Sequence, residues 1–146
     1  MSLVCPSDHT ICVHASAIAF QERAVLIMGG SGTGKSTLAL QLMALNCALI
    51  ADDKTILNRL DDRIIASVPS QLSGKIEARH VGILNANPAD PTALALCVDL
   101  DHVEPDRLPP HRNVTFLDVQ LPLIWGKGRD HLAYMILQYL KRGRSA

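Results

Sequence analysis

The sequence predicts an α/β fold in which helices flank a mixed β-sheet, and three observations lead to this prediction. An apolar run at residues 24–28 leads directly into a glycine-rich stretch at residues 29–37, after which the chain takes up a helical periodicity. Two strand-like runs, residues 55–57 and 63–68, follow one another too closely for a helical crossover, so part of the sheet should be antiparallel. The last apolar residues of the chain recur at the spacing of an amphipathic helix.

The length and composition favour one domain without a nucleic-acid or membrane partner. The 146 residues fit a single domain, which we assign to residues 1–146. Lysine and arginine total 14, as do aspartate and glutamate, so no overall charge attracts nucleic acid or an anionic membrane. Aromatic residues make up only 3% of the chain, which disfavours stacking on single strands. No apolar run approaches the roughly 18 residues of a membrane span, and no signal-peptide pattern opens the chain, so we expect a cytoplasmic protein.

The first half of the chain predicts a hairpin, a helix and a further strand. Residues 11–20 alternate weakly and precede a polar break, so they should form a hairpin with the strand at 24–28. One face of the helix that begins at the glycine-rich stretch carries Leu38, Gln41, Leu42 and Leu45. Asn46 is expected to end that helix as a left-handed cap. Residues 47–53 then form an apolar strand that ends in two adjacent carboxylates.

The second half predicts short strands and a terminal helix. Residues 55–57 and 63–68 flank Leu60-Asp61-Asp62 and should form a hairpin. Loops separate the further strands, which are expected in the later part of 75–84, at 92–100 and at 113–119. The terminal helix should begin after Asp130 as its N-cap and end before Gly143, with an apolar face formed by Leu132, Met135, Ile136, Tyr139 and Leu140.

Residues 29–36 match the pattern G-x-x-x-x-G-K-S in the strand-loop-helix context of a phosphate-binding loop. The glycines let backbone N–H groups turn inward on phosphate oxygens, where side chains would block the approach. Lys35 can supply a charge to the β and γ oxygens, and the Ser36 hydroxyl is placed to bind Mg²⁺. We therefore predict a nucleotide site formed by Gly29, Gly30, Ser31, Gly32, Thr33, Gly34, Lys35, Ser36 and Thr37.

The acid pair Asp52-Asp53 is the second candidate part of the site. The carboxyl ends of strands in an open α/β sheet face the ligand crevice, so this pair should lie at the same edge as the phosphate-binding loop. Phosphoryl transfer needs a group near the nucleophile that can take its proton. One acid can act on the acceptor hydroxyl while the other binds the metal, or one can bind the metal while the other only caps the turn. The sequence is compatible with both divisions of roles. His14 can hydrogen-bond one of the pair if its hairpin packs beside this edge.

These motifs together resemble the catalytic domain of the HPr kinase/phosphorylase family. The resemblance rests on H-x-S at 14–16, G-x-S-G-x-G-K-S at 29–36, L-I-A-D-D at 49–53 and E-x-R-x-x-G-I-L at 77–84. It covers about residues 9–120 and implies a phosphate-loop core related to phosphoenolpyruvate carboxykinases. It also implies a short form of the enzyme that lacks the family's separate N-terminal domain.

The resemblance implies a role for each matched residue. Asp52 would be the general base that deprotonates the target serine, and His14 would orient it or share its charge. Asp53 would support the metal shell, while Ser36 and Glu77 would hold Mg²⁺.

The remaining implications of the resemblance concern the reaction and its partners. Lys35 would act on the phosphates of ATP, and Arg112, in a loop like the family's later R-P-G-R-N segment, would serve dephosphorylation. The family implies ATP- and Mg²⁺-dependent phosphorylation of a serine in an HPr-like phosphocarrier protein of a phosphotransferase system, with phosphorolytic removal of the same group. It also implies a homo-oligomer, a hexamer in the family.

Two residues depart from the family's motifs. His80 and His111 stand where the family has glycine, which predicts different backbone geometry in both loops. Two alternative functions stay open at this point: a small-metabolite kinase, against which the lack of an arginine-rich lid counts, and a nucleotide-binding regulatory module without catalysis.

Overall fold

The computed structural model describes residues 9–146, so the prediction of one domain over 1–146 is assessed for those residues only. The strands are β1 (Thr10–Val13), β2 (Ser16–Phe20), β3 (Arg23–Met28), β4 (Ala48–Ala51), β5 (Thr55–Leu60), β6 (Arg63–Ser67), β7 (Lys75–Ala78), β8 (Gly82–Asn85), β9 (Thr92–Asp99), β10 (Arg112–Phe116) and β11 (Val119–Trp125). The helices are α1 (Lys35–Ala44), a short 3₁₀ turn (Ser70–Leu72) and α2 (Leu132–Arg142).

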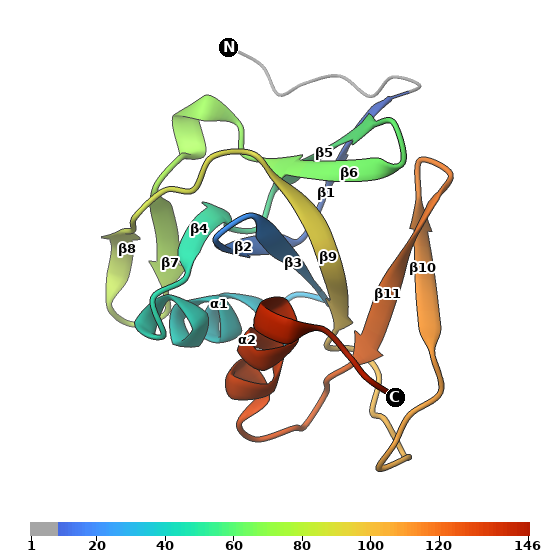
Figure 1. The fold of residues 1–146 in the computed structure, drawn as a ribbon. Helices are drawn as coiled ribbons and strands as arrows, with labels where there is room; N and C mark the ends of the chain where they lie inside the picture. The colour runs from blue at the N-terminus through green and yellow to red at the C-terminus, as the bar shows by residue number, and fades with distance from the viewer. Residues whose placement is uncertain (1–8) are drawn as a thin grey trace.

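A mixed sheet forms the centre of the fold, as the sequence predicts (Figure 1). Its strand order is β1-β5-β6-β9-β3-β2-β4, and the hairpin β10-β11 joins through β9. The β3-β9 and β9-β11 pairs are parallel, whereas the others are antiparallel. Because β2 is antiparallel to both β3 and β4, those two strands run in the same direction and end at one edge of the sheet. The predicted placement of the phosphate-binding loop and the acid pair at one edge is therefore confirmed.

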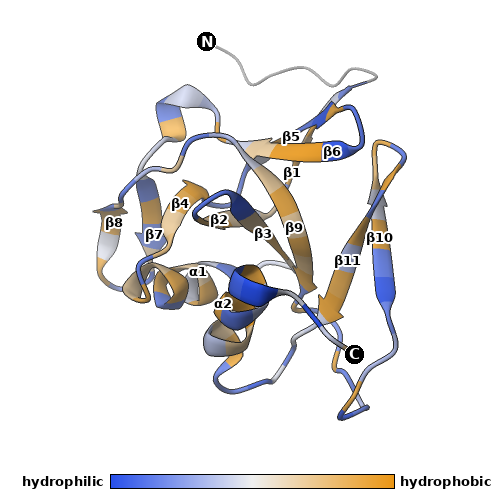
Figure 2. Ribbon diagram, in the orientation of Figure 1, coloured by the Kyte–Doolittle hydropathy of each residue, from blue (hydrophilic) through white to orange (hydrophobic). Residues whose placement is uncertain are grey.

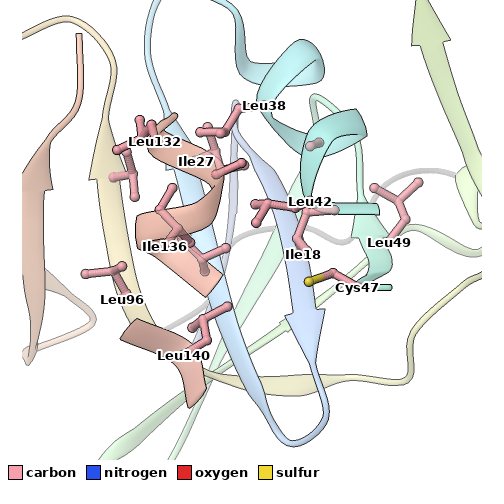
Figure 3. Close-up of a cluster of buried hydrophobic side chains, with 14 of the residues drawn as sticks. Ile18, Ile27, Leu38, Leu42, Cys47, Leu49, Leu96, Leu132, Ile136 and Leu140 are labelled. Atoms are coloured by element: carbon pink, nitrogen blue, oxygen red, sulfur yellow. The ribbon is translucent and has the colours of Figure 1, made fainter. Parts of the chain in front are cut away.

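The core has two layers, one on each face of the central strand β3. Val25 and Ile27 point to the side covered by α1 and α2, where the helices pack on the sheet (Figure 3). Ala24 and Leu26 point to the other side, where the sheet curls so that β5, β6 and β11 pack over it. Apolar residues follow the central strands, and polar residues gather in the connections and on the outer parts of α2 (Figure 2). A strand buried on both faces explains why residues 24–28 are continuously apolar.

Two kinks lie opposite one another in the sheet and shape the site. Val13 of β1 pairs with Thr55 of β5, and Ala17 of β2 pairs with Ala51 of β4. Between these pairs, residues 14–16 have no ladder partner among residues 52–54, although Ser16 still pairs with Ile27 of β3. The run 11–20, expected to be one extended segment, is therefore two strands, of which only β2 forms the predicted hairpin with β3. The kinks place the H-x-S segment against the acid pair.

Three local expectations need correction, and one cap is confirmed. Residues 75–84 form the hairpin β7-β8 rather than a single strand. Residues 112–125 form the hairpin β10-β11 rather than one strand at 113–119, and its two-residue turn has positive φ at both Leu117 and Asp118. The N-cap of α2 is His131 and not Asp130. Asn46 does end α1 in the left-handed conformation, with φ of 71°.

Between residues 9 and 146, neither helix has the length and apolar character needed to cross a bilayer.

Candidate active site

A cavity of about 530 Å³ opens where β3 and β4 end. It brings together most of the residues predicted for the site: His14, Ser31, Gly32, Gly34, Lys35, Ser36, Thr37, Asp52, Asp53 and Glu77. Gly29, Gly30 and Thr33 belong to the same loop but do not line the cavity, and Arg112 does not line it either. Leu40, Ala78, Arg79 and Val81 complete the lining.

The phosphate-binding loop is closed by its own hydrogen bonds. Thr33 donates its backbone N–H and its hydroxyl to the Gly30 carbonyl, at 3.2 and 2.8 Å. A Cβ atom on Gly29 would lie 2.5 Å from the Thr33 hydroxyl oxygen, so only glycine fits there. Gly34, with φ of 100°, turns the chain into α1, and the residues at the start of this helix, Lys35, Ser36 and Thr37, line the cavity. This arrangement suits an anion at the start of α1.

Lys35 is a buried residue, and its ammonium group lies inside the loop. Its Nζ donates to the carbonyl oxygens of Gly29 at 2.8 Å and Gly30 at 3.0 Å. An ammonium group has three donors, so these two bonds leave one for a phosphate oxygen. The loop thus holds Lys35 ready for an anionic ligand.

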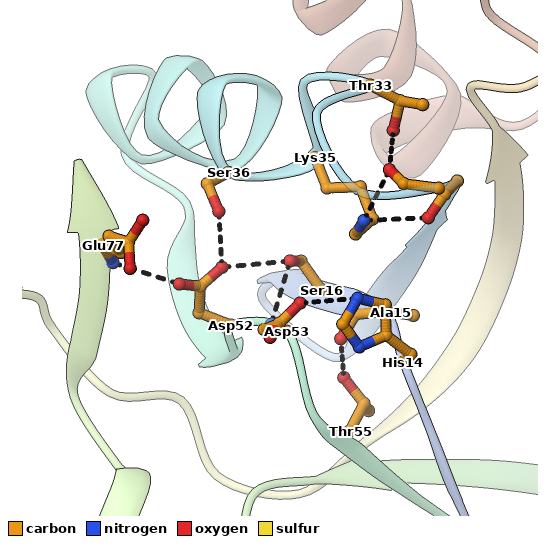
Figure 4. A network of polar contacts seen from close by, with 12 residues as sticks. His14, Ala15, Ser16, Thr33, Lys35, Ser36, Asp52, Asp53, Thr55 and Glu77 are labelled. Carbon is orange, nitrogen blue, oxygen red and sulfur yellow. Dashed lines mark hydrogen bonds and ion pairs between the residues drawn. The ribbon is translucent and has the colours of Figure 1, made fainter. Parts of the chain in front are cut away.

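The carboxylate of Asp52 accepts hydrogen bonds on both oxygens (Figure 4). Its Oδ1 accepts from the Ser36 hydroxyl at 2.8 Å and from the Ser16 hydroxyl at 3.1 Å. Its Oδ2 accepts from the backbone N–H of Glu77 at 3.1 Å. Three donors match the ionised, acceptor-only form of a carboxylate. Asp52 therefore points toward the phosphate-binding loop and the hydroxyl predicted to bind Mg²⁺.

Asp53 lies in different surroundings although it is the next residue. Its Oδ1 is 3.0 Å from Nε2 of His14, and both side chains are more than half exposed, at 54% and 58%. Its backbone has φ of 70°, a left-handed conformation that aspartate tolerates better than most residues. His14 contacts the acid pair as predicted, but its partner is Asp53 and not Asp52. The more accessible carboxylate is thus the one beside the histidine.

A shared magnesium shell is feasible around Ser36, Asp52 and Glu77. The Ser36 hydroxyl touches Asp52, and Glu77 lies beside it on β7 and lines the same cavity. Among residues 9–146, no three His, Cys, Asp or Glu side chains form a metal-binding cluster by themselves. Proteins usually hold Mg²⁺ with one or two carboxylates, while phosphates and water supply the other ligands.

Sequence reasoning missed two contacts of the site. Ser16 belongs to the H-x-S motif, from which the sequence predicts no role for it, but its hydroxyl contacts both acidic residues. Asp101 accepts a hydrogen bond on Oδ1 from the Gly30 N–H at 3.0 Å, so the loop after β9 supports the phosphate-binding loop. The signal for Asp101 is topological: β9 is the parallel neighbour of β3, so its carboxyl end meets the loop.

Arg112 lies outside the cavity, which corrects its expected place in the site. Its guanidinium donates from Nε and Nη2 to the two carboxylate oxygens of Glu104, at 3.0 and 3.1 Å. The same guanidinium lies 3.5 Å from the ring centre of Trp125, and His102 stacks near that ring. Arg129 adds a hydrogen bond to the Glu104 carbonyl. These contacts tie the loop after β9 to β10 and β11.

The Arg112-Glu104 pair predicts a pH-dependent contribution to stability. The hydrogen bond from Arg112 holds the pKa of Glu104 below its ordinary value. A carboxylate with a lowered pKa stabilises the fold above its unfolded pKa of about 4.3, and this stabilisation is lost as the pH falls through the folded pKa. We expect Glu104→Gln to unfold more easily than the wild type near pH 7, with a difference that shrinks on acidification.

Denaturant unfolding at a series of pH values measures this effect. Glu22→Gln, at an exposed glutamate in the turn between β2 and β3, is the matched control and should show a small difference throughout. A Glu104→Gln difference that stays constant down to acid pH would contradict the assignment.

Comparison with known proteins agrees with this geometry. Residues 8–123 match the family model described as HPr Serine kinase C-terminal domain. The chain is 33% identical over 126 residues to the HPr kinase/phosphorylase of Geobacillus thermodenitrificans, which covers 77% of this chain and 41% of the relative. It is 35% identical over 75 residues to that of Malacoplasma penetrans, covering 51% of this chain and 25% of the relative.

A solved structure extends the similarity to the fold. The structure of the Hpr(Ser) kinase/phosphatase from Coxiella burnetii matches with a TM-score of 0.74 and 25% identity, covering 90% of this chain and 88% of that one. The chain spans about a quarter to two fifths of the length of the two curated relatives described above. The family match covers most of the chain and includes the phosphate-binding loop, the acid pair and Glu77. The chain belongs to the HPr serine kinase C-terminal domain family.

Proposed function

We propose that this chain is an ATP- and Mg²⁺-dependent kinase that phosphorylates a serine of an HPr-like phosphocarrier protein. One observation carries the proposal: two adjacent acids at the phosphate-binding loop have different partners, Asp52 the hydroxyl of Ser36 and Asp53 the imidazole of His14. The names of the relatives, HPr kinase/phosphorylase, support the class of target.

The phosphate-binding loop and Lys35 would hold the phosphates of ATP. The backbone N–H groups at the start of α1 and the third donor of the Lys35 ammonium are available for this. Ser36, Asp52 and Glu77 would hold Mg²⁺, which supplies positive charge to the phosphates during transfer. This set differs from the one that the family resemblance implied, because Asp52 takes the place of Asp53 beside Ser36.

Asp53 would be the general base. Its carboxylate is half exposed and is paired with the His14 imidazole, so it can receive a proton from an approaching serine. The serine oxygen forms a bond to the γ-phosphorus, the bond to the β,γ-bridging oxygen breaks, ADP leaves, and the serine proton passes to Asp53. Asp52 already accepts three hydrogen bonds, which makes it the poorer proton acceptor. His14 would orient Asp53 and share its charge.

In phosphorolysis an oxygen of inorganic phosphate would attack the phosphoserine phosphorus and the bond from phosphorus to the serine oxygen would break. Pyrophosphate would form, and Asp53 would return the proton to the serine oxygen. Arg112, which the resemblance ties to dephosphorylation, is paired with Glu104 outside the cavity. The geometry therefore supports the kinase reaction more than the phosphorylase reaction. We include self-association, in a hexamer as in the family, and a cytoplasmic location in the proposal.

A phosphotransfer assay tests the proposed function. Purified protein with ATP, Mg²⁺ and the HPr-like protein of the same organism should yield phosphoserine, detected by mass spectrometry. The absence of phosphoserine with any such phosphocarrier would overturn the proposal. Transfer to a small metabolite instead would indicate a metabolite kinase, and nucleotide binding without transfer would indicate a regulatory module.

A further inference from the structure

We propose that Ser16 is a positioning residue that fixes Asp52 and Asp53 in separate roles. This inference rests on the proposed function, because it assigns Asp52 to the magnesium shell and Asp53 to the acceptor serine. Ser16 is fully buried, at 0% exposure, and it is the first residue of β2. Its hydroxyl lies between two consecutive acidic residues and contacts both of them (Figure 4).

The two hydrogen bonds of Ser16 have opposite directions. The backbone N–H of Asp53 donates to Ser16 Oγ at 3.2 Å, so the oxygen is the acceptor in that bond. The single hydroxyl proton is then available to Asp52, whose Oδ1 lies 3.1 Å away. Ser36 donates to the same Oδ1 at 2.8 Å. Ser16 and Ser36 together orient the Asp52 carboxylate toward the start of α1.

The bond to Asp53 acts on the backbone instead of the side chain. Asp53 has φ of 70°, a conformation that needs support from its surroundings in a residue with a Cβ atom. The hydroxyl of Ser16 holds the N–H of Asp53 in this conformation, and the Asp53 side chain then lies toward His14. One hydroxyl thus turns successive carboxylates toward different partners.

A second buried hydroxyl, beside the same kinks, provides a matched comparison. Thr55 is also fully buried, and its Oγ1 donates to the carbonyl of Ala15 at 2.8 Å. It holds the 14–16 segment in place, whereas the hydrogen bonds of the two acids go to other groups. Loss of the Thr55 hydroxyl should therefore affect the stability of the kink, whereas loss of the Ser16 hydroxyl should also affect the metal and the reaction.

The test compares Ser16→Ala, Ser16→Thr and Thr55→Val with the wild type. Partners of metal ligands typically change metal affinity or activity by about 10- to 100-fold when removed. We expect Ser16→Ala to raise the Mg²⁺ concentration needed for tight nucleotide binding by about that factor, and to lower kcat with little change in KM. Nucleotide affinity without Mg²⁺ should stay the same. Ser16→Thr should restore most of both properties, and Thr55→Val should lower the melting temperature only.

Calorimetry of nucleotide binding at a series of Mg²⁺ concentrations needs no phosphocarrier, so it separates the two proposals. If the wild-type protein phosphorylates no phosphocarrier but Ser16→Ala needs more Mg²⁺ for tight nucleotide binding, the positioning role of Ser16 is supported and the proposed function fails. A Ser16→Ala variant with wild-type Mg²⁺ dependence and kcat, or with the same profile as Thr55→Val, overturns the inference. If Ser16→Ala does not fold, Ser16→Cys replaces it, because a thiol keeps the shape but is a weak hydrogen-bonding group.

Discussion

Replacing Asp53 with asparagine should lower kcat for phosphoryl transfer by about 10²- to 10⁴-fold, the usual contribution of a general base. Asparagine is similar in shape and tolerates the left-handed backbone that Asp53 adopts, so the fold should persist. Nucleotide binding should be unchanged, because Asp53 has no contact with the phosphate-binding loop among the hydrogen bonds of the site. Single-turnover kinetics with ATP and the phosphocarrier measure the rate of transfer.

Asp62→Asn is the matched control for this prediction. Asp62 is exposed in the turn between β5 and β6 and does not line the cavity, so the same chemical change there should leave kcat unaltered. An Asp53→Asn enzyme with nearly wild-type kcat would show that another group takes the serine proton.

Replacing Lys35 with methionine should weaken nucleotide binding by roughly 10- to 150-fold, the value of a hydrogen bond to a charged group. The transfer rate should fall further, by about 10²- to 10³-fold, because a positioned donor stabilises charge that develops in the transition state. Methionine fills the buried space of the side chain but cannot donate to the Gly29 and Gly30 carbonyls or to a phosphate. Calorimetry and single-turnover kinetics measure the two effects.

Lys127→Met makes the same change at an exposed lysine that does not line the cavity, and it should bind nucleotide as the wild type does. Wild-type affinity in Lys35→Met would mean that the nucleotide binds without the loop lysine, and the site would have to be placed elsewhere.

The phosphate-binding loop was predictable because its determinants are local. Three consecutive segments make up the motif: the apolar run of β3, the glycines of the loop and the first residues of α1. Each segment favours its own backbone conformation without contacts from distant parts of the chain. The placement of Asp52 at the same edge followed from a general rule of α/β sheets, and it holds even though β2 lies between β3 and β4.

The turn between β10 and β11 could not be recognised from the sequence because its two residues, Leu117 and Asp118, are neither glycine nor asparagine. Two-residue turns with positive φ at both positions usually contain those residues. The start of α2 was misplaced by one residue for a related reason: His131 adopts a left-handed conformation without a side-chain cap, whereas the sequence favours Asp130 as the capping residue.

The different surroundings of Asp52 and Asp53 depend on tertiary structure. Both acids follow the same strand, and only the matching kinks at 14–16 and 52–54 decide which of them meets His14 and which meets Ser36. The pairing of Arg112 is similar, because Glu104 and Trp125 come from other parts of the chain and hold its guanidinium away from the cavity. Local motifs identified the residues but not their partners.

The division of roles between the two acids is the central claim, and nucleotide affinity measured against Mg²⁺ concentration in Asp52→Asn and Asp53→Asn tests it most directly. We predict that Asp52→Asn loses the Mg²⁺ enhancement of nucleotide binding while Asp53→Asn keeps it, because only Asp52 is bonded to Ser36. The reverse pattern, with the enhancement lost in Asp53→Asn and kept in Asp52→Asn, would contradict this account.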